Sequence, residues 1–202
     1  MKKAFYLVLA IIGNGLGSAI MFQTHLGMSA WGASASNVSL FFGITPGVSF
    51  IAVSALFYII AIVVRKKFVW SQFFLSMIFL VSFSVVLDLF ILWLPEFTSL
   101  HLAWKVLINI LGMLILLGSI SLHLYVDIAV HPMDVFLQTM QKNVFKNVLN
   151  GTYFAYSCAF VIAITFGLLA GGIRDIGIGT VLTLTLGGLV MAFYDKYVIT
   201  KL

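Results

Sequence analysis

Charged residues are scarce in this chain of 202 residues. Asp, Glu, Lys and Arg make up 8% of it, against about 25% in soluble domains. Hydrophobic residues make up 62%, and the mean hydropathy is +1.17. A soluble core of this size cannot hide so much apolar surface, so the composition excludes a water-soluble domain and predicts a protein that folds in lipid.

Cysteine and the groups of catalytic or cofactor sites are also scarce. The single cysteine, Cys158, lies in an apolar run and has no partner for an intramolecular disulfide. The sequence holds no nucleophile–base–acid set and no metal-ligand spacing. No lysine follows Gly177-Ile178-Gly179-Thr180, as a phosphate loop would require. We therefore expect no enzyme activity, no cofactor and no bound metal.

Long apolar runs are what the sequence has in abundance. A spanning helix needs about 20 mostly apolar residues, and six segments meet that length: 4–24, 46–64, 70–94, 102–126, 149–170 and 176–198. The period-two alternation of a closed barrel is absent. The prediction is an all-α membrane protein with six transmembrane helices in a single polytopic domain, residues 1–202.

The basic residues predict the orientation, because Lys and Arg concentrate in cytoplasmic loops. With the N-terminus inside, only Lys105 and Arg174 of the 11 Lys and Arg residues face outward. This predicts a multi-pass protein of the cell membrane with both termini in the cytoplasm. It also accounts for the net charge of +5, so that charge does not indicate a nucleic-acid partner.

Two glycine- or proline-containing stretches, residues 26–32 and 129–134, interrupt the apolar pattern at matching places. When they are aligned, His131 falls opposite Ser29 and Asp134 falls opposite Gly32. We interpret the match as an internal duplication, with one repeat at about 4–94 and the other at about 102–198. Each repeat has three spans, an odd number, so the second enters the membrane from the opposite side. Inverted repeats of this kind recur in transporters.

A weaker helical segment follows each stretch, which gives each half a broken or re-entrant piece. Residues 29–42 are small and polar, and the sequence leaves open whether they dip into the membrane or lie on it. Residues 132–147 begin with proline, which is favoured at a helix start. Their apolar side chains recur at steps of three and four, which predicts an amphipathic helix at the membrane surface.

Four places in the sequence carry a resemblance to a known family: residues 26–31, Asp88 in the third span, His131-Pro132-Met133-Asp134, and Gly177-Ile178-Gly179-Thr180. At these residues the chain resembles the YczE/YyaS group of bacterial integral membrane proteins and, more distantly, YitT. The resemblance covers nearly the whole chain and implies a multi-pass membrane protein, with neither an established activity nor a substrate.

The chain also departs from the pattern of that group. Ala30 and Gly32 stand where the group has proline and aspartate, so the first repeat lacks the acid that Asp134 retains in the second. If a pair of aspartates acts together in the group, this chain has only one of the two.

Six residues are candidates for binding a substrate: Gly27, Ser29, Trp31, Asp88, His131 and Asp134. A carboxylate within a span is costly in lipid, so Asp88 is expected to face the bundle or a cavity. It could bind a proton or a cation, or merely hydrogen-bond a neighbouring helix near the outer boundary. Asp127, His131 and Asp134 cluster at the cytoplasmic end of the fourth span, and His123 shares a helix face with Asp127. This cluster could relay protons or bind a metal, or it could have a structural or interfacial role.

Three functions from different classes remain open. The first is a carrier or channel-like protein for an unknown small solute. The second is a substrate-capturing subunit of an ATP-driven importer, which the stretch at residues 26–32 does not favour. The third is a membrane partner that regulates another protein through residues 127–150. The lipid bilayer is the one certain partner, and a homodimer or a partner protein is left open.

Overall fold

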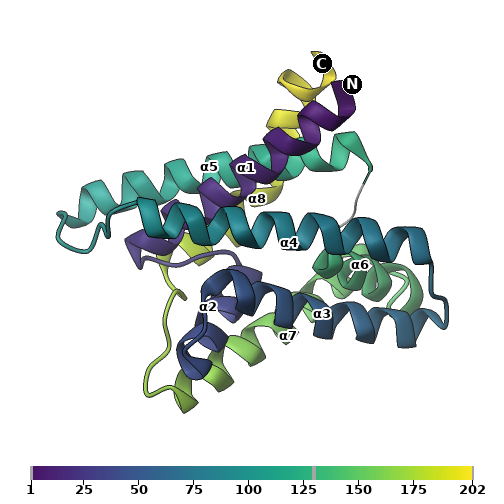
Figure 1. The fold of residues 1–202 in the computed structure, drawn as a ribbon, viewed down its shortest axis with the longest axis horizontal. Coiled ribbons are helices and arrows are strands. Elements are labelled where there is room, and N and C mark those ends of the chain that lie inside the picture. Colours follow the sequence, from purple (N-terminus) through teal and green to yellow (C-terminus); the bar gives the residue numbers. More distant parts are fainter. Residues whose placement is uncertain (1, 129–130, 202) are drawn as a thin grey trace.

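The computed structural model describes residues 2–128 and 131–201, which are helical apart from their connections. Its six long helices are α1 (Lys2–Thr24), α3 (Pro46–Arg65), α4 (Trp70–Trp93), α5 (Leu102–Val126), α7 (Val148–Leu169) and α8 (Ile178–Tyr197) (Figure 1). All six are long and apolar enough to cross a membrane. The six predicted spans are therefore confirmed, and the chain is a multi-pass membrane protein.

Two shorter helices follow the two predicted breaks. They are α2 (Ala30–Phe42) and α6 (Pro132–Thr139), and α6 continues into a π-helical turn, η1 (Met140–Val144). A 3-10 turn, η2 (Ile199–Lys201), follows α8. Residues 129 and 130 of the second predicted break lie outside the described residues.

Local sequence explains where α2 ends and α3 begins. Gly43 has φ 64°, the left-handed conformation that favours glycine at the end of a helix. Pro46 is the first residue of α3, where its missing N–H costs nothing. The Thr45 hydroxyl accepts a hydrogen bond from the backbone N–H of Val48, which caps the new helix.

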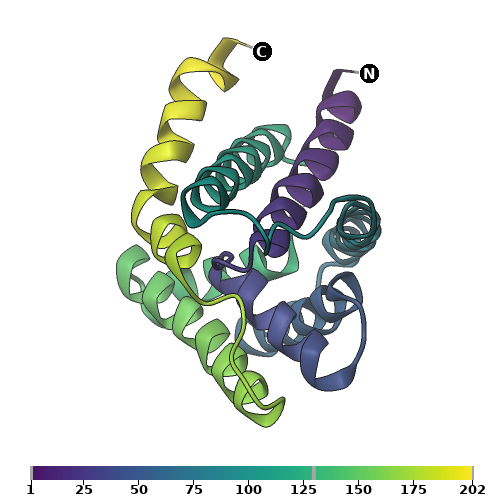
Figure 2. The ribbon, with the colours of Figure 1, turned by 90° about the vertical axis from the view of Figure 1, so that its left-hand side faces the viewer.

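The helices form two groups that meet along α1 and α4 (Figures 1 and 2). In one group α1 packs along α5, and α5 packs along α8. The α1–α5 crossing is close because both helices carry glycine there: a Cβ on Gly17 would lie 2.5 Å from the Leu116 nitrogen and 2.7 Å from the Gly112 oxygen. Small residues at a crossing allow this backbone contact between membrane helices.

The other group contains α2, α3, α6 and α7. Helix α2 lies between α3 and α7, and α6 also packs against both. Met133, Phe136 and Met140 are buried there. The expectation that residues 132–147 lie on the membrane surface is therefore wrong for α6, because neighbouring helices cover its apolar face in place of lipid.

The two groups leave one side open. Helix α3 packs along α4, whereas α7 and α8 make no comparable contact within the described residues. Figure 2 shows these two helices running apart from the loop that joins them. In consequence α7 and α8 are the least buried of the six long helices.

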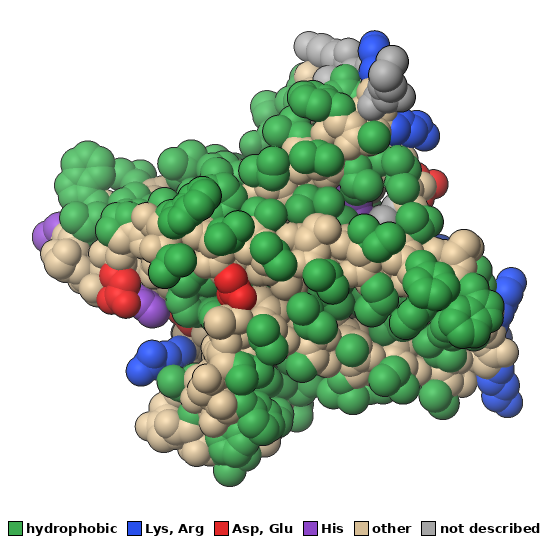
Figure 3. All heavy atoms as spheres, viewed as in Figure 1, with side chains coloured by type: hydrophobic (Ala, Val, Ile, Leu, Met, Phe, Trp, Pro, Cys, Tyr) green, Lys and Arg blue, Asp and Glu red, His purple; other side chains and the backbone are tan. Residues whose placement is uncertain are grey.

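Apolar side chains are spread over the face shown in Figure 3, among backbone and other side chains. On α4 and α5, exposed residues include Trp70, Ile78, Leu92, Leu107 and Leu111. In water this surface would be unfavourable, and in lipid it is the expected exterior.

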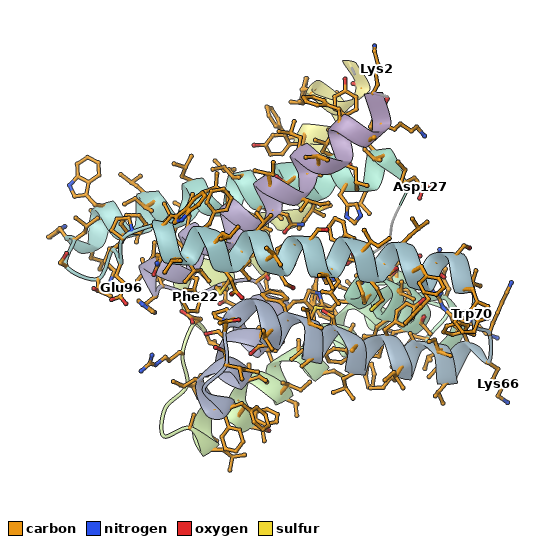
Figure 4. All side chains as sticks on the ribbon, viewed as in Figure 1. Lys2, Phe22, Lys66, Trp70, Glu96 and Asp127 are labelled. Atoms are coloured by element: carbon orange, nitrogen blue, oxygen red, sulfur yellow. The ribbon has the colours of Figure 1, made fainter. Side chains whose placement is uncertain are left out.

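Charged residues gather at the ends of the long helices. Figure 4 shows Lys2, Lys66 and Asp127 toward one end and Glu96 at the opposite one. We name these the basic end, which also carries both chain termini (Figure 1), and the far end.

Candidate functional site

A cavity of about 510 Å³ lies between the two groups of helices. Residues from α1, α5, α7 and α8 form its walls, and the first residues of α2 and α6 both reach it. Four of the six predicted site residues line it: Ser29, Trp31, His131 and Asp134. The two breaks, about 100 residues apart in the sequence, are thus brought to one site.

On the α2 side, Ser29 ends the break and caps the helix. Its Oγ accepts a hydrogen bond from the Gly32 N–H at 3.2 Å, which satisfies a backbone donor that a helix start leaves unpaired. Trp31 packs edge-on against Phe57 of α3, Phe136 of α6 and Tyr156 of α7, with ring centroids 5.0, 6.4 and 5.9 Å away. Trp31 is therefore the side chain that joins α2 to the other three helices of its group.

On the α6 side, His131 has the capping role. Its Nδ1 accepts a hydrogen bond from the Met133 N–H at 3.2 Å, and Pro132 is the first helical residue. The imidazole contacts the rings of Phe79 and Phe83 edge-on, at 5.7 and 5.9 Å. An imidazole nitrogen that accepts a hydrogen bond carries no proton, so the hydrogen bond from the Met133 N–H indicates a neutral His131.

Two titratable groups with shifted pKa values in the cavity, His131 and Asp134, lie at the start of α6. Helix α6 is not one of the six spanning helices. Burial lowers the pKa of His131 to about 3, and His123 nearby lowers it further. Burial raises the pKa of Asp134 to about 6, because desolvation disfavours the charged carboxylate. Among the described lining residues Asp134 is the only acid, and none is Lys or Arg.

The other two predicted residues do not line the cavity. Gly27 has φ 114°, and a Cβ there would lie 2.8 Å from the Gly177 nitrogen, so the glycine allows the α1–α2 connection to touch the start of α8. Asp88 accepts hydrogen bonds from the Gly47 N–H at 2.8 Å and the Thr45 hydroxyl at 2.5 Å. It thus joins α4 to the start of α3. This is the second expectation for Asp88, a hydrogen bond to a neighbouring helix.

The cavity also contains residues that the sequence did not single out. Tyr156 of α7, Gln138 of α6 and Thr183 of α8 all line it. Each is a polar side chain in a mostly apolar segment, and this is the one sequence feature that could have marked it as a cavity residue. Nothing local distinguished them from Thr185, which is exposed and does not line the cavity.

A polar cluster joins the α7–α8 connection to α2 toward the far end. Buried Asp175, in the α7–α8 connection, accepts a short hydrogen bond from Ser36 of α2 and lies 3.6 Å from His25 Nδ1. The Asn37 side chain donates to the Arg174 carbonyl at 2.7 Å and accepts from the Arg174 N–H at 2.9 Å. These contacts fasten the α7–α8 connection onto α2 and the α1–α2 connection.

No metal site is formed by the described residues, since they contain no group of three or more His, Cys, Asp or Glu side chains able to hold an ion. His123 stacks on Phe79, with ring centroids 4.0 Å apart. This aromatic contact links α5 to α4 beside the cavity.

Comparison with known proteins identifies the family. The chain belongs to the family described as "Family of unknown function (DUF6198)", which matches residues 1–196. The match spans all six long helices and both short ones. No curated protein and no solved structure matches the chain.

Proposed function

We propose that this DUF6198 protein carries a small solute across the membrane, with the cavity between α2 and α6 as its binding site. One observation carries the proposal: two interrupted segments, one from each half of the chain, begin at the same cavity. Carriers commonly bind substrate where discontinuous helices meet between two repeats. Non-helical backbone is also tolerated within a membrane protein where it faces a cavity.

The packing of the helices supports an arrangement as two inverted repeats. If α1–α4 correspond to α5–α8 in order, the α1–α4 contact matches the α5–α8 contact. The α2–α7 contact likewise matches the α6–α3 contact, and α1 packs on its own counterpart, α5. This exchange of partners is what a pseudo-two-fold axis through the α1–α5 crossing would produce.

The orientation follows from charge. Lys2 and Lys66 lie at the basic end, so this end faces the cytoplasm under the positive-inside rule. Both termini are then cytoplasmic, and the Asp175 cluster closes the cavity on the outer side. The protein belongs in the cell membrane, consistent with the resemblance to the YczE/YyaS group.

Transport also requires a second conformation in which the outer side opens. The contacts of Asp175 with Ser36 and His25 would break in that state, because they hold the α7–α8 connection over α2. The α7–α8 side would move most easily, since these helices have the least buried surface to disrupt.

An uptake experiment without a preselected solute tests the proposal. Proteoliposomes are exposed to a metabolite extract, washed, and analysed by mass spectrometry for retained small molecules. Thr183→Trp fills the cavity from α8. Thr185→Trp is the matched control, because both threonines bond to a carbonyl four residues earlier but only Thr183 lines the cavity.

The expected result is a solute enriched several-fold by the wild-type protein and by Thr185→Trp, and not by Thr183→Trp. If no solute depends on the protein, or if both variants retain it equally, the carrier proposal is wrong.

A further inference from the structure

The charge of the cavity restricts what it can bind. Asp134 lines the cavity, and no described residue donates a hydrogen bond to its carboxylate. His131 uses Nδ1 as an acceptor and is neutral, and the described lining residues offer no Lys or Arg. Asp134 is half-buried, and a carboxylate with restricted access to water is stabilised when an opposite charge pairs with it. The missing partner is therefore a positive charge.

Aromatic rings surround the same space. Trp31, Phe50, Phe83 and Tyr156 all line the cavity. The face of an aromatic ring attracts an organic cation, by about 0.5–2 kcal/mol depending on how far water is excluded. A carboxylate and several rings around one space are the elements of an ammonium-binding pocket.

The remaining lining argues against an inorganic ion. Leu116, Leu117, Leu184 and Met191 contribute apolar walls, and one carboxylate does not supply the several oxygen ligands that a small metal ion takes. The cavity also extends between α7 and α8, which do not pack along each other in the described part of the chain. The space therefore suits an apolar body attached to the charge.

We propose that the cavity binds an organic monocation, an amine or quaternary ammonium compound with an apolar body, with Asp134 as its counter-ion. This inference rests on the proposed carrier function and specifies its substrate class. The ammonium lies between Asp134 and the aromatic rings, and the apolar body lies along α5 and α8.

Three soluble probes that share a phenyl ring test the inference by equilibrium dialysis against the full-length protein in nanodiscs. They are benzyltrimethylammonium, benzyl alcohol and benzenesulfonate, and protein-free nanodiscs correct for partition into lipid. We expect the cation to bind at least tenfold more tightly than the other two. Asp134→Asn removes this preference, whereas Asp195→Asn, the same change at an exposed site on α8, leaves it.

The pH dependence gives a second readout, because the charge of a quaternary ammonium ion does not titrate. The cation's affinity falls as pH decreases through about 6, where Asp134 takes up a proton. The other titratable side chains facing the cavity are His131 on α6, His123 on α5 and Tyr156 on α7. Asp134→Asn flattens the profile, and melting curves establish that the variant is folded.

The inference is wrong if the neutral or anionic probe binds as tightly as the cation, if none of the three binds, or if Asp134→Asn leaves the preference unchanged. The uptake experiment with Thr183→Trp is independent of charge. A solute that passes that experiment while the cation preference fails would keep the carrier proposal and reject the substrate class.

Discussion

The two short helices begin at the same cavity but differ in chemistry. Helix α2 starts with Ser29 as its cap and carries no charged residue. Most of its residues are small and buried. Helix α6 starts with His131 as its cap and carries Asp134 in its first turn. The two capping residues make the same kind of bond to the backbone, whereas only α6 brings a carboxylate.

This difference separates two roles within one architecture. At its far-end side α2 is fastened to the α7–α8 connection through Ser36 and Asn37, so in the proposed carrier it would serve closure. Helix α6 places Asp134 at the cavity, so in the proposed carrier it would serve recognition. If the two halves are repeats, as proposed, only one copy carries an acid at the cavity.

The largest expected effect concerns the crossing that joins the two halves. Gly17→Val would push side-chain atoms into the backbone at Leu116 and Gly112, which cannot move aside. The cost exceeds the about 1–3 kcal/mol of ordinary overpacking, so we expect no monodisperse protein by size-exclusion chromatography. Gly188→Val, also within a helix, has no described atom within 4 Å of the new Cβ and should purify normally. Equal yields of the two variants would contradict the close backbone contact between α1 and α5 at Gly17.

The second prediction concerns the acid that only α6 has. Because the folded pKa of Asp134 is raised from 3.8 to about 6, the carboxylate destabilises the fold as pH rises from about 4 through 6. Asp134→Asn should therefore raise stability at pH 7.5, on the order of 2 kcal/mol. The gain should vanish below pH 4, as measured by thermal unfolding in detergent.

Asp88→Asn provides the contrast for that experiment. Asp88 accepts two hydrogen bonds at the start of α3, so this variant should lose about 1–3 kcal/mol at pH 7.5. Changes of the same sign in Asp88→Asn and Asp134→Asn would contradict the distinction between a structural carboxylate and a cavity carboxylate.

The third prediction compares the two caps. Ser29→Ala removes the acceptor for the Gly32 N–H and should lower stability by about 1 kcal/mol. Ser29→Asn retains a side-chain oxygen and should restore most of the loss. Identical melting temperatures for Ser29→Ala and the wild type would show that the α2 cap does not contribute to stability.

The smallest expected effect concerns the far-end cluster. The Asp175 carboxylate, 3.6 Å from His25 Nδ1, raises the pKa of His25 above 6.5, with partial burial opposing it and Glu96 adding a weaker attraction. The stabilisation is complete below pH 6.5 and is lost as pH rises through the raised pKa. His25→Gln should lower stability by less than about 1 kcal/mol at pH 6 and by nothing at pH 9. A loss independent of pH would contradict a charged His25.

The sequence predicted the long helices well, because length and hydropathy alone decide which segments can span lipid. It also singled out six candidate residues, of which Ser29, Trp31, His131 and Asp134 line the cavity. It could not place Gly27 and Asp88. Gly27 contacts Gly177 and Asp88 contacts Thr45, and each of these partners is distant in the sequence. The position of α6 was mispredicted because periodicity gives an apolar face without saying whether lipid or protein covers it.

Native mass spectrometry of the protein, extracted gently from its own membrane, tests the central claim most directly. We expect a protomer or homodimer that retains a small cationic molecule, with the retained mass present in Thr185→Trp and absent in Thr183→Trp. A stoichiometric complex with an ATPase or another protein would instead favour a capturing subunit or a regulatory partner. That result, or a retained mass unaffected by Thr183→Trp, would contradict the account.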